Sequence, residues 1–388
     1  MSLQITNLMV GADWEPQIEP FLRDNDNEGA IAEIDRLIQE EQPSPELTIQ
    51  KGMILIQTGN YESALEIFDS VLQIEPESVG ALLGKGISQY ILFQSDETLD
   101  LFQKVVSLKP DYYRGWVNLG ILLNTNEQYG EALKALDHAI TLFKEPTDAW
   151  AGRALVLNNM EEYDLAITSC NKAIKINPDN FIAWLVKADA LENKVELKES
   201  LKAAKEAIRI NPHHPLAWRA MGITLYGLSK FDKAIDALRQ SLLLDNDISG
   251  SWHALGLALL KNKEYEEALV AFDVQLHADP EDIPALGNKG ITLYLLHRYE
   301  EARDVLQTAI EINPHYVFGL NNLGLVYQAL GKKEEAMIAY GAVIALEPSN
   351  IQANTNRNIL LEDLSINHKL KRGKKGKKTG FSKRDKRD

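Results

Sequence analysis

Residues 147–180 read TDAWAGRALVLNNMEEYDLAITSCNKAIKINPDN, and this stretch decides the fold. It contains two apolar runs with the spacing of amphipathic helices, separated by a short polar turn at Glu161 and Glu162. Pro178 follows the second run. Because proline lacks a backbone N–H and disfavours helix in the residue before it, the second helix must stop there. The stretch predicts helix, turn, helix and stop.

The same pattern recurs every 34 residues without insertion or deletion. The proline that ends each unit is present in all but two of them, where Lys144 and Asn246 take its place. The prolines are at 76, 110, 178, 212, 280, 314 and 348, and the nine units start at 45, 79, 113, 147, 181, 215, 249, 283 and 317.

Small residues occupy two fixed places in every unit. Numbered from the start of its unit, place eight is always Gly or Ala, and place twenty is always Ala, Ser or Thr. Small side chains at two fixed points let two antiparallel helices approach closely. Each unit is therefore predicted to be a tight helical hairpin.

Five of the six tryptophans occupy place four of successive units. Places four, eight and eleven lie four and three residues apart, so they share one face of the first helix, and that face is predicted to pack inward. Recurrence at this period is what packing produces, and it favours a core role over a cofactor-binding one. The five residues are Trp116, Trp150, Trp184, Trp218 and Trp252.

These places and this spacing resemble the tetratricopeptide repeat family over residues 45–350. The chain departs from the family pattern at place eleven, which is usually Leu, and at place seven, which is often Lys or Arg. The resemblance implies an all-α fold, a right-handed α-solenoid of stacked antiparallel helix pairs. It also implies that the first helices line a concave face in which an extended peptide or a partner helix binds.

The chain is predicted to have four parts. A degenerate repeat or cap covers 1–44, where Pro16 and Pro20 disfavour a regular first helix but Ala30 to Ile38 support a second one. Nine repeats cover 45–350, and a capping helix with a polar outer face covers 351–368. The segment 369–388 is rich in Lys and Arg, lacks periodic apolar residues and is predicted to be disordered.

The concave face is predicted to present places two, five, nine and twelve of each first helix. The Lys and Asn that clamp a chaperone tail in family members are absent from places five and nine, so docking of that kind is not expected. Early repeats instead present apolar residues such as Ile49, Leu83 and Val117, suited to an apolar helix or strand. The candidate groove residues are Arg219, His253, Tyr226, Tyr294, Asn118, Asn288, Asn321 and Asn322.

Three of these asparagines, Asn118, Asn288 and Asn322, share place six. An asparagine side chain both donates and accepts, so a row of them could hold a peptide backbone without reading its sequence. The glycosyltransferase member of the family uses such a row, but here only three of nine units have it.

No motif points to catalysis. The sequence contains no HExxH, CxxC, P-loop or GxSxG pattern, and the repeats occupy nearly the whole chain. The pair His213-His214 has no evident third metal ligand, and Cys170 falls at a core place. We therefore expect no enzyme activity, no metal, no cofactor and no small-molecule substrate.

The net charge of −15 conceals two opposite parts. Residues 369–388 contain eleven Lys or Arg and two Asp, or +9, which leaves −24 for the rest. The tail could fold back on the acidic body, contact nucleic acid or a ribosome, or serve as a targeting or membrane-surface element. Its basic residues include Lys371, Arg372, Lys374, Lys375, Lys377 and Lys378.

The first residues show no export signal, and no apolar run is long enough to span a membrane. A single cysteine fits a reducing compartment, so a cytoplasmic location is expected. The sequence predicts a scaffold or adaptor that binds a protein partner in its groove. The alternative is a nucleic-acid- or ribosome-associated factor that uses the basic tail.

Overall fold

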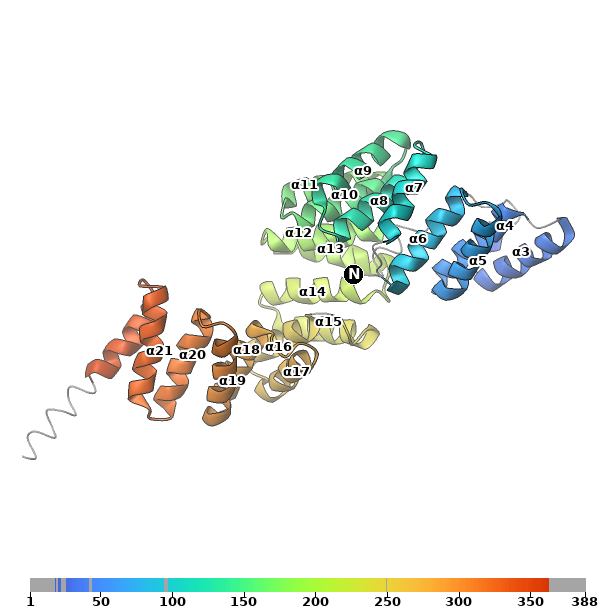
Figure 1. Cartoon of the computed structure of the whole chain (residues 1–388). Coiled ribbons are helices and arrows are strands. Elements are labelled where there is room, and N and C mark those ends of the chain that lie inside the picture. Colours follow the sequence, from blue (N-terminus) through green and yellow to red (C-terminus); the bar gives the residue numbers. More distant parts are fainter. Residues whose placement is uncertain are drawn as a thin grey trace, which may run out of the picture. The chain divides into compact units, whose positions relative to one another are not determined.

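The computed structural model describes residues 18, 20–21, 26–41, 44–93, 97–248 and 250–362. Throughout these ranges the regular secondary structure is helical, and no strand occurs in them (Figure 1). The helices are α3 (Asn27–Glu41), α4 (Pro45–Gln57), α5 (Tyr61–Ile74), α6 (Val79–Phe93), α7 (Glu97–Leu108), α8 (Tyr113–Thr125), α9 (Tyr129–Leu142), α10 (Thr147–Asn159), α11 (Tyr163–Ile176), α12 (Phe181–Asn193), α13 (Leu197–Ile210), α14 (Pro215–Gly227), α15 (Phe231–Leu244), α16 (Ser251–Lys261), α17 (Tyr265–Ala278), α18 (Ile283–Leu295), α19 (Tyr299–Ile312), α20 (Val317–Ala329) and α21 (Lys333–Leu346). A further helix spans 351–362.

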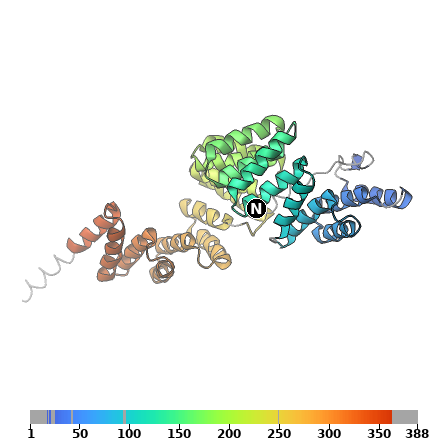
Figure 2. The same ribbon diagram turned by 45° about the horizontal axis from the view of Figure 1, so that its top comes forward.

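Each predicted repeat forms two helices that pack against each other, from α4 and α5 to α20 and α21. Within each of the two units described below, the second helix of a pair packs against the first helix of the next, as α11 does against α12. Figures 1 and 2 show this stacking of hairpins from two directions. The predicted all-α solenoid of antiparallel helix pairs is confirmed.

Contacts divide the chain into two compact units. Unit 1 comprises residues 1–213 and includes α3 to α13, whereas unit 2 comprises residues 214–388 and includes α14 to α21 and the helix 351–362. Each unit contains complete helix pairs, so the same packing rules apply within both.

In the core of each hairpin, the side chain at place eight of the first helix must be small enough to leave room for the side chain at place twenty-four of the second. A Cβ added at Gly256 would lie 2.6 Å from the Phe272 ring, and one at Gly324 would lie 2.4 Å from the Tyr340 ring. These distances are too short for a side chain, so the large residue of the second helix requires glycine on the first. Where place eight is alanine, place twenty-four is small: the pairs are Ala154 with Cys170 and Ala188 with Ala204.

Backbone hydrogen bonds close the turn of each hairpin whose turn lies in the described residues. The N–H of place sixteen donates to the carbonyl of place eleven, as in Glu196 to Leu191 at 2.8 Å. The residue between the helices, at place fifteen, adopts a left-handed conformation in which glycine is favoured. Gly59 and Gly331 satisfy this preference, whereas Val195 has φ of 62° despite its branched Cβ.

Polar contacts repeat between neighbouring pairs. Where place seven is basic, it reaches the residue sixteen positions earlier, on the preceding second helix, as Lys85 Nζ does to Asp69 Oδ1 at 2.6 Å. Lys51–Asp35, Arg153–Asp137 and Lys289–Asp273 repeat this ion pair. Because exposed ion pairs each contribute only about 0–1 kcal/mol, their main effect is to favour one register between pairs.

The tryptophans of place four differ from the prediction. All five are half-buried rather than enclosed in the core. Where the contact is given, the indole N–H donates to the carbonyl six residues earlier, as Trp184 does to Pro178 at 2.8 Å. The prediction of an inward-packing face is right for places eight and eleven, but place four lies at its edge because its ring must reach the turn between hairpins.

Both ends of the described chain are packed. Near the beginning, Ile18 and Ile34 are fully buried in a cluster with Ile54, and α3 confirms the helix predicted there. Near the other end, Ala353 and Leu360 of the helix 351–362 pack against α21. Residues 363–368 of the predicted capping helix, and most of the predicted degenerate segment before Ile18, lie outside the described residues.

The match between places eight and twenty-four predicts the outcome of a double-mutant cycle. Gly256→Ala is expected to destabilise the chain by about 1–3 kcal/mol, because its methyl group overlaps the Phe272 ring. Phe272→Cys alone should cost about 3–5 kcal/mol by leaving a cavity. The loss in free energy of unfolding of the double variant should be about 1 kcal/mol smaller than the sum of the two single losses. Denaturant unfolding would measure all three.

Gly341→Ala is the matched control, because it makes the same change inside α21 where nothing lies within 4 Å of an added Cβ. It should stabilise the helix by up to about 1 kcal/mol. Equal effects of the two Gly→Ala changes would contradict the proposed packing constraint.

Candidate functional site

The candidate site is the inner face of unit 2, formed by first helices. In this unit α14, α16, α18 and α20 contact one another in succession. Among the described helices of this unit, successive second helices do not contact one another to a comparable extent. Within unit 2 the first helices are therefore closer together than the second helices and form the inner side of the stack.

An aliphatic row runs along the middle of this face. It consists of the place-nine residue of each first helix: Ile223, Leu257, Ile291 and Leu325. All four are half-buried, unlike the core residues of the same helices. A continuous, partly accessible apolar row of this kind is a surface that the apolar side chains of a peptide can cover.

Arg219 lies beside this row on α14. Its guanidinium reaches the start of α16, where Nη2 lies 3.6 Å from the position of a Cβ on Gly250. The Nε atom is buried and has no hydrogen-bond partner among the described residues. A buried donor without a partner costs about 1–3 kcal/mol, so a ligand acceptor placed here would remove that cost.

Asn321, at the same place on α20, offers the complementary group. Its Nδ2 donates to Gln352 Oε1 at 2.8 Å, which fixes the amide, and its Oδ1 is buried without a hydrogen-bond partner. The inner face therefore holds one unsatisfied donor and one unsatisfied acceptor. A peptide backbone carries both complementary groups at every residue.

His253 and Asn288 meet between α16 and α18. Asn288 Nδ2 lies 3.1 Å from His253 Nε2, so the neutral ring accepts this hydrogen bond, and Nδ2 also donates to Pro284 at 2.9 Å. Burial lowers the pKa of His253 below its usual value, although the nearby Asp282 carboxylate opposes that shift. The ring is therefore held in its neutral form near pH 7.

Tyr226 and Tyr294 lie at place twelve and are half-buried. The ring of Tyr226 contacts Phe231, with centroids 5.8 Å apart, and that of Tyr294 contacts Tyr299, with centroids 5.6 Å apart. Burial raises the pKa of Tyr226, so its hydroxyl stays protonated. Each tyrosine is thus held against the second helix of its own pair.

The three place-six asparagines do not form an accessible row. Asn118 lies in unit 1, and the other two lie in unit 2. Asn118 and Asn322 are buried, and each amide donates to a carbonyl of its own helix, that of Arg114 at 2.8 Å and that of Phe318 at 2.9 Å. Asn288 makes the same bond but remains half-buried.

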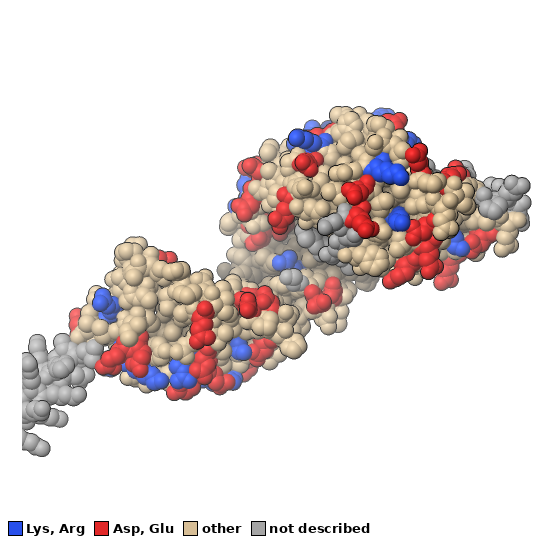
Figure 3. Space-filling view, in the orientation of Figure 1, with Lys and Arg blue, Asp and Glu red and all other residues tan. Residues whose placement is uncertain are grey.

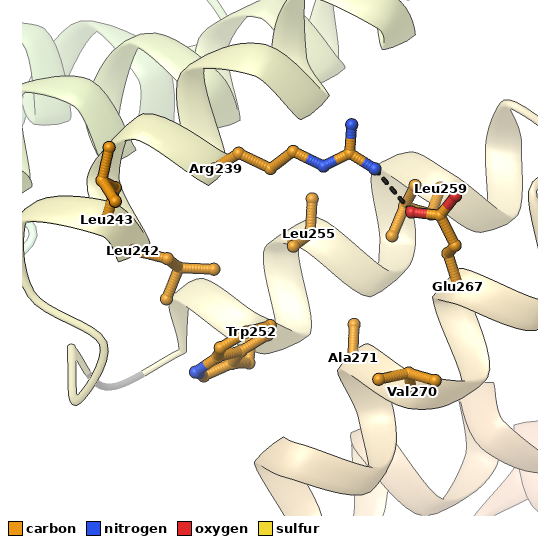
Figure 4. A pocket seen from close by; sticks show the side chains of 9 residues that line it. All are labelled: Arg239, Leu242, Leu243, Trp252, Leu255, Leu259, Glu267, Val270 and Ala271. Carbon is orange, nitrogen blue, oxygen red and sulfur yellow. Dashed lines mark hydrogen bonds and ion pairs between the residues drawn. The ribbon is translucent and has the colours of Figure 1, made fainter.

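A second surface, not predicted from the sequence, lies on the opposite side of α16. It is a pocket of about 390 Å³ bounded by α15, α16 and α17 (Figure 4). Leu243 and Val270 are exposed at its edges, and Arg239 pairs with Glu267 across it. The lining residues are Arg239, Leu242, Leu243, Trp252, Leu255, Leu259, Glu267, Val270 and Ala271.

The sequence does contain a signal for this pocket. Place seven is Leu255 here instead of Lys or Arg, and the residue sixteen positions earlier is Arg239 instead of an acid. The usual ion pair between neighbouring hairpins is therefore replaced by an apolar floor. The signal is visible only once the pairing of these two places is known.

The surface charge of the described residues is mainly acidic. On the face in Figure 3, acidic side chains are widespread over both units, and charged groups gather along one edge of unit 2 over α17 and α19. The predicted basic residues Lys371, Arg372, Lys374, Lys375, Lys377 and Lys378 lie outside the described residues.

The described ranges contain no group of three or more His, Cys, Asp or Glu placed to hold a metal ion. His213 is exposed and His214 is buried. Cys170 is fully buried, as predicted, and burial raises the pKa of its thiol to about 12. None of the helices in the described part of the chain is long and apolar enough to cross a membrane.

Family models of the tetratricopeptide repeat match the chain at residues 46–78, 147–180, 219–283 and 319–350, and a TPR repeat model matches 290–331. The chain belongs to the tetratricopeptide repeat family. No curated protein sequence matches it.

Solved tetratricopeptide repeat structures resemble this one in fold. The APC/C hetero-tetramer Cut9-Hcn1 matches at 14% identity with a TM-score of 0.59, covering 89% of this chain and 82% of that chain. The human IFIT1 dimer with m7Gppp-AAAA matches at 15% identity with a TM-score of 0.59, covering 89% of this chain and 94% of that chain. At these identities the likeness shows the fold alone.

The environment of His253 predicts a pH dependence of stability. Because its folded-state pKa is lowered, the unfolded state binds the proton more readily, and stability is present above about pH 6.5 and lost as the pH falls below it. His253→Gln should flatten this part of the pH profile. Denaturant unfolding of unit 2 at several pH values would measure it.

His315→Gln is the matched control, since it removes an exposed histidine of the same unit. This control should keep the slope of the parent chain. The same slope in the His253→Gln variant as in the parent chain would contradict the assignment.

Proposed function

We propose that the chain binds an extended segment of a partner protein along the inner face of unit 2. The repeats and the fold support a role in protein interaction generally, and the choice of this face rests on one observation. The buried Nε–H of Arg219 and the buried Oδ1 of Asn321 both lack hydrogen-bond partners beside an accessible aliphatic row.

The chemistry of the face determines what it can bind. Peptide carbonyls would accept from Arg219, and peptide N–H groups would donate to Asn321. The aliphatic row would cover apolar side chains of the same segment, and Tyr226 and Tyr294 would border it. The ligand is thus an extended peptide with apolar residues, not one recognised by a terminal carboxylate.

The proposal predicts a separation between binding and stability. Peptides selected from a random linear library by the full chain should bind the double variant Arg219→Ala/Asn321→Ala about tenfold or more weakly. The unfolding midpoint should change little, because the loss of the Asn321–Gln352 hydrogen bond is offset by the removal of two buried atoms without partners among the described residues. Fluorescence anisotropy and denaturant unfolding would measure the two effects.

The control is Leu243→Ala/Val270→Ala, which changes exposed residues of the pocket opposite the inner face. It should leave peptide affinity unchanged. If the control weakened binding while the inner-face variant did not, the partner would bind the pocket and the proposal would be wrong.

The alternative, nucleic-acid association, rests on the basic tail. The human IFIT1 dimer was solved with m7Gppp-AAAA, but at 15% identity that structure supports only a similar fold for this chain. If residues 369–388 bind nucleic acid, affinity for a single-stranded oligonucleotide should fall steeply with salt, with a slope of roughly −0.7 per phosphate contacted. Truncation after residue 368 should then abolish binding.

The chain truncated after residue 368 is the control in this test, because its net charge of −24 repels phosphates. Oligonucleotide binding that survives truncation would contradict a role for the tail. Absence of binding in both forms would favour the tail folding back on the body.

A further inference from the structure

On α6 and α8 of unit 1, the inner face is buried where that of unit 2 is accessible. Leu83 and Ile87 of α6 occupy places five and nine, as do Val117 and Ile121 of α8, and none is more than 2% exposed. On α4, Ile56 at place twelve is also fully buried. These places belong to the face that a first helix turns away from its own hairpin.

The described helix contacts of α8 and α16 are similar in kind. The main contacts of α8 are with α7, α9 and α10, and those of α16 are with α14, α15, α17 and α18. Leu257 of α16 is nevertheless half-buried, whereas Ile121 at the same place of α8 is 1% exposed. The list of neighbouring helices alone does not predict that difference.

We propose that residues 1–17 of the same chain bind along this face and occupy it. Ile18, the residue that follows this segment, is fully buried against α3 and α4, next to the first of the covered helices. Seventeen extended residues span up to roughly 60 Å, whereas three helices spaced 8–10 Å apart span roughly 20–30 Å. The segment therefore reaches from α4 past α8.

The composition of the segment fits an apolar face. It contains Leu3, Ile5 and the run Leu8-Met9-Val10, and its charged side chains are Asp13 and Glu15. The other long segment outside the described residues, 363–388, is strongly basic and would not match an aliphatic surface. Chemistry and position thus select residues 1–17 as the occupant.

Tethering makes this occupancy effective. A short linker gives the segment an effective concentration in the millimolar range, so even a weak intrinsic affinity keeps the face filled. A partner with a similar apolar segment would have to displace it. This intramolecular competition concerns unit 1 and does not depend on the peptide proposed to bind unit 2.

Thiol labelling of the full chain tests the proposal. Ile121→Cys and Leu257→Cys place reporter thiols at the same place of α8 and α16, and the only native cysteine, Cys170, is fully buried with its pKa raised to about 12. With the native segment, the Ile121→Cys reporter should react with a maleimide at least about tenfold more slowly than the Leu257→Cys reporter.

The segment is then changed in place by Leu8→Asp, Met9→Asp and Val10→Asp. In this background the Ile121→Cys reporter should react within about twofold of the Leu257→Cys reporter, whose own rate should not change. Cys170 should remain unlabelled in every variant, which shows that the chain stays folded.

Two outcomes would overturn the proposal. One is fast labelling of the Ile121→Cys reporter in the presence of the native segment. The other is slow labelling that persists in the Asp-substituted chain. If that slow labelling became faster on dilution, a second copy of the chain, not its own residues 1–17, would be the occupant.

Discussion

The structure depends on a steric constraint between the two helices of each hairpin. A ring or branched side chain at place twenty-four occupies the volume where place eight would carry a Cβ, so the helices can approach only if place eight is glycine. The two hairpins with alanine at place eight contain Cys170 and Ala204 opposite it, which keeps the combined volume small. Every hairpin satisfies this condition, so the two helices of each can pack closely.

Much of the fold could be predicted from the sequence, because the relevant interactions are local. Small residues, apolar periodicity and turn prolines recur within 34 residues, and each acts within one hairpin or between two neighbours. The division into two units could not be predicted, since no composition change marks His213 and His214. It depends on contacts between hairpins whose repeats look alike.

The candidate site was predicted only in part, for a physical reason. Periodicity shows which face a residue lies on, but not how far its neighbours cover it. Asn118 and Asn322 were identified by place, yet their amides bond to their own helices. Arg219 and Asn321 share a place on their helices, and only the structure shows that each has a buried atom without a hydrogen-bond partner. The pocket beside Leu255 depends on a pairing of places that no single residue reveals.

The two inner faces suggest different roles within one repeat array. Unit 2 combines an accessible aliphatic row with buried polar atoms that lack partners among the described residues, whereas in unit 1 the aliphatic residues of α6 and α8 at the same places are buried. The same helix places thus provide an accessible surface in one unit and an enclosed one in the other. Differences in side chains, not in backbone, produce this division.

The turns within the hairpins leave their side chains free to differ. In the described turns the closing hydrogen bonds from place sixteen to place eleven join backbone atoms, and place fifteen holds glycine, acid, base, hydroxyl and even valine in different hairpins. The charge and shape of these loops can therefore be changed almost independently of the core. They are sites at which a new recognition surface could be introduced without disturbing the helices beneath.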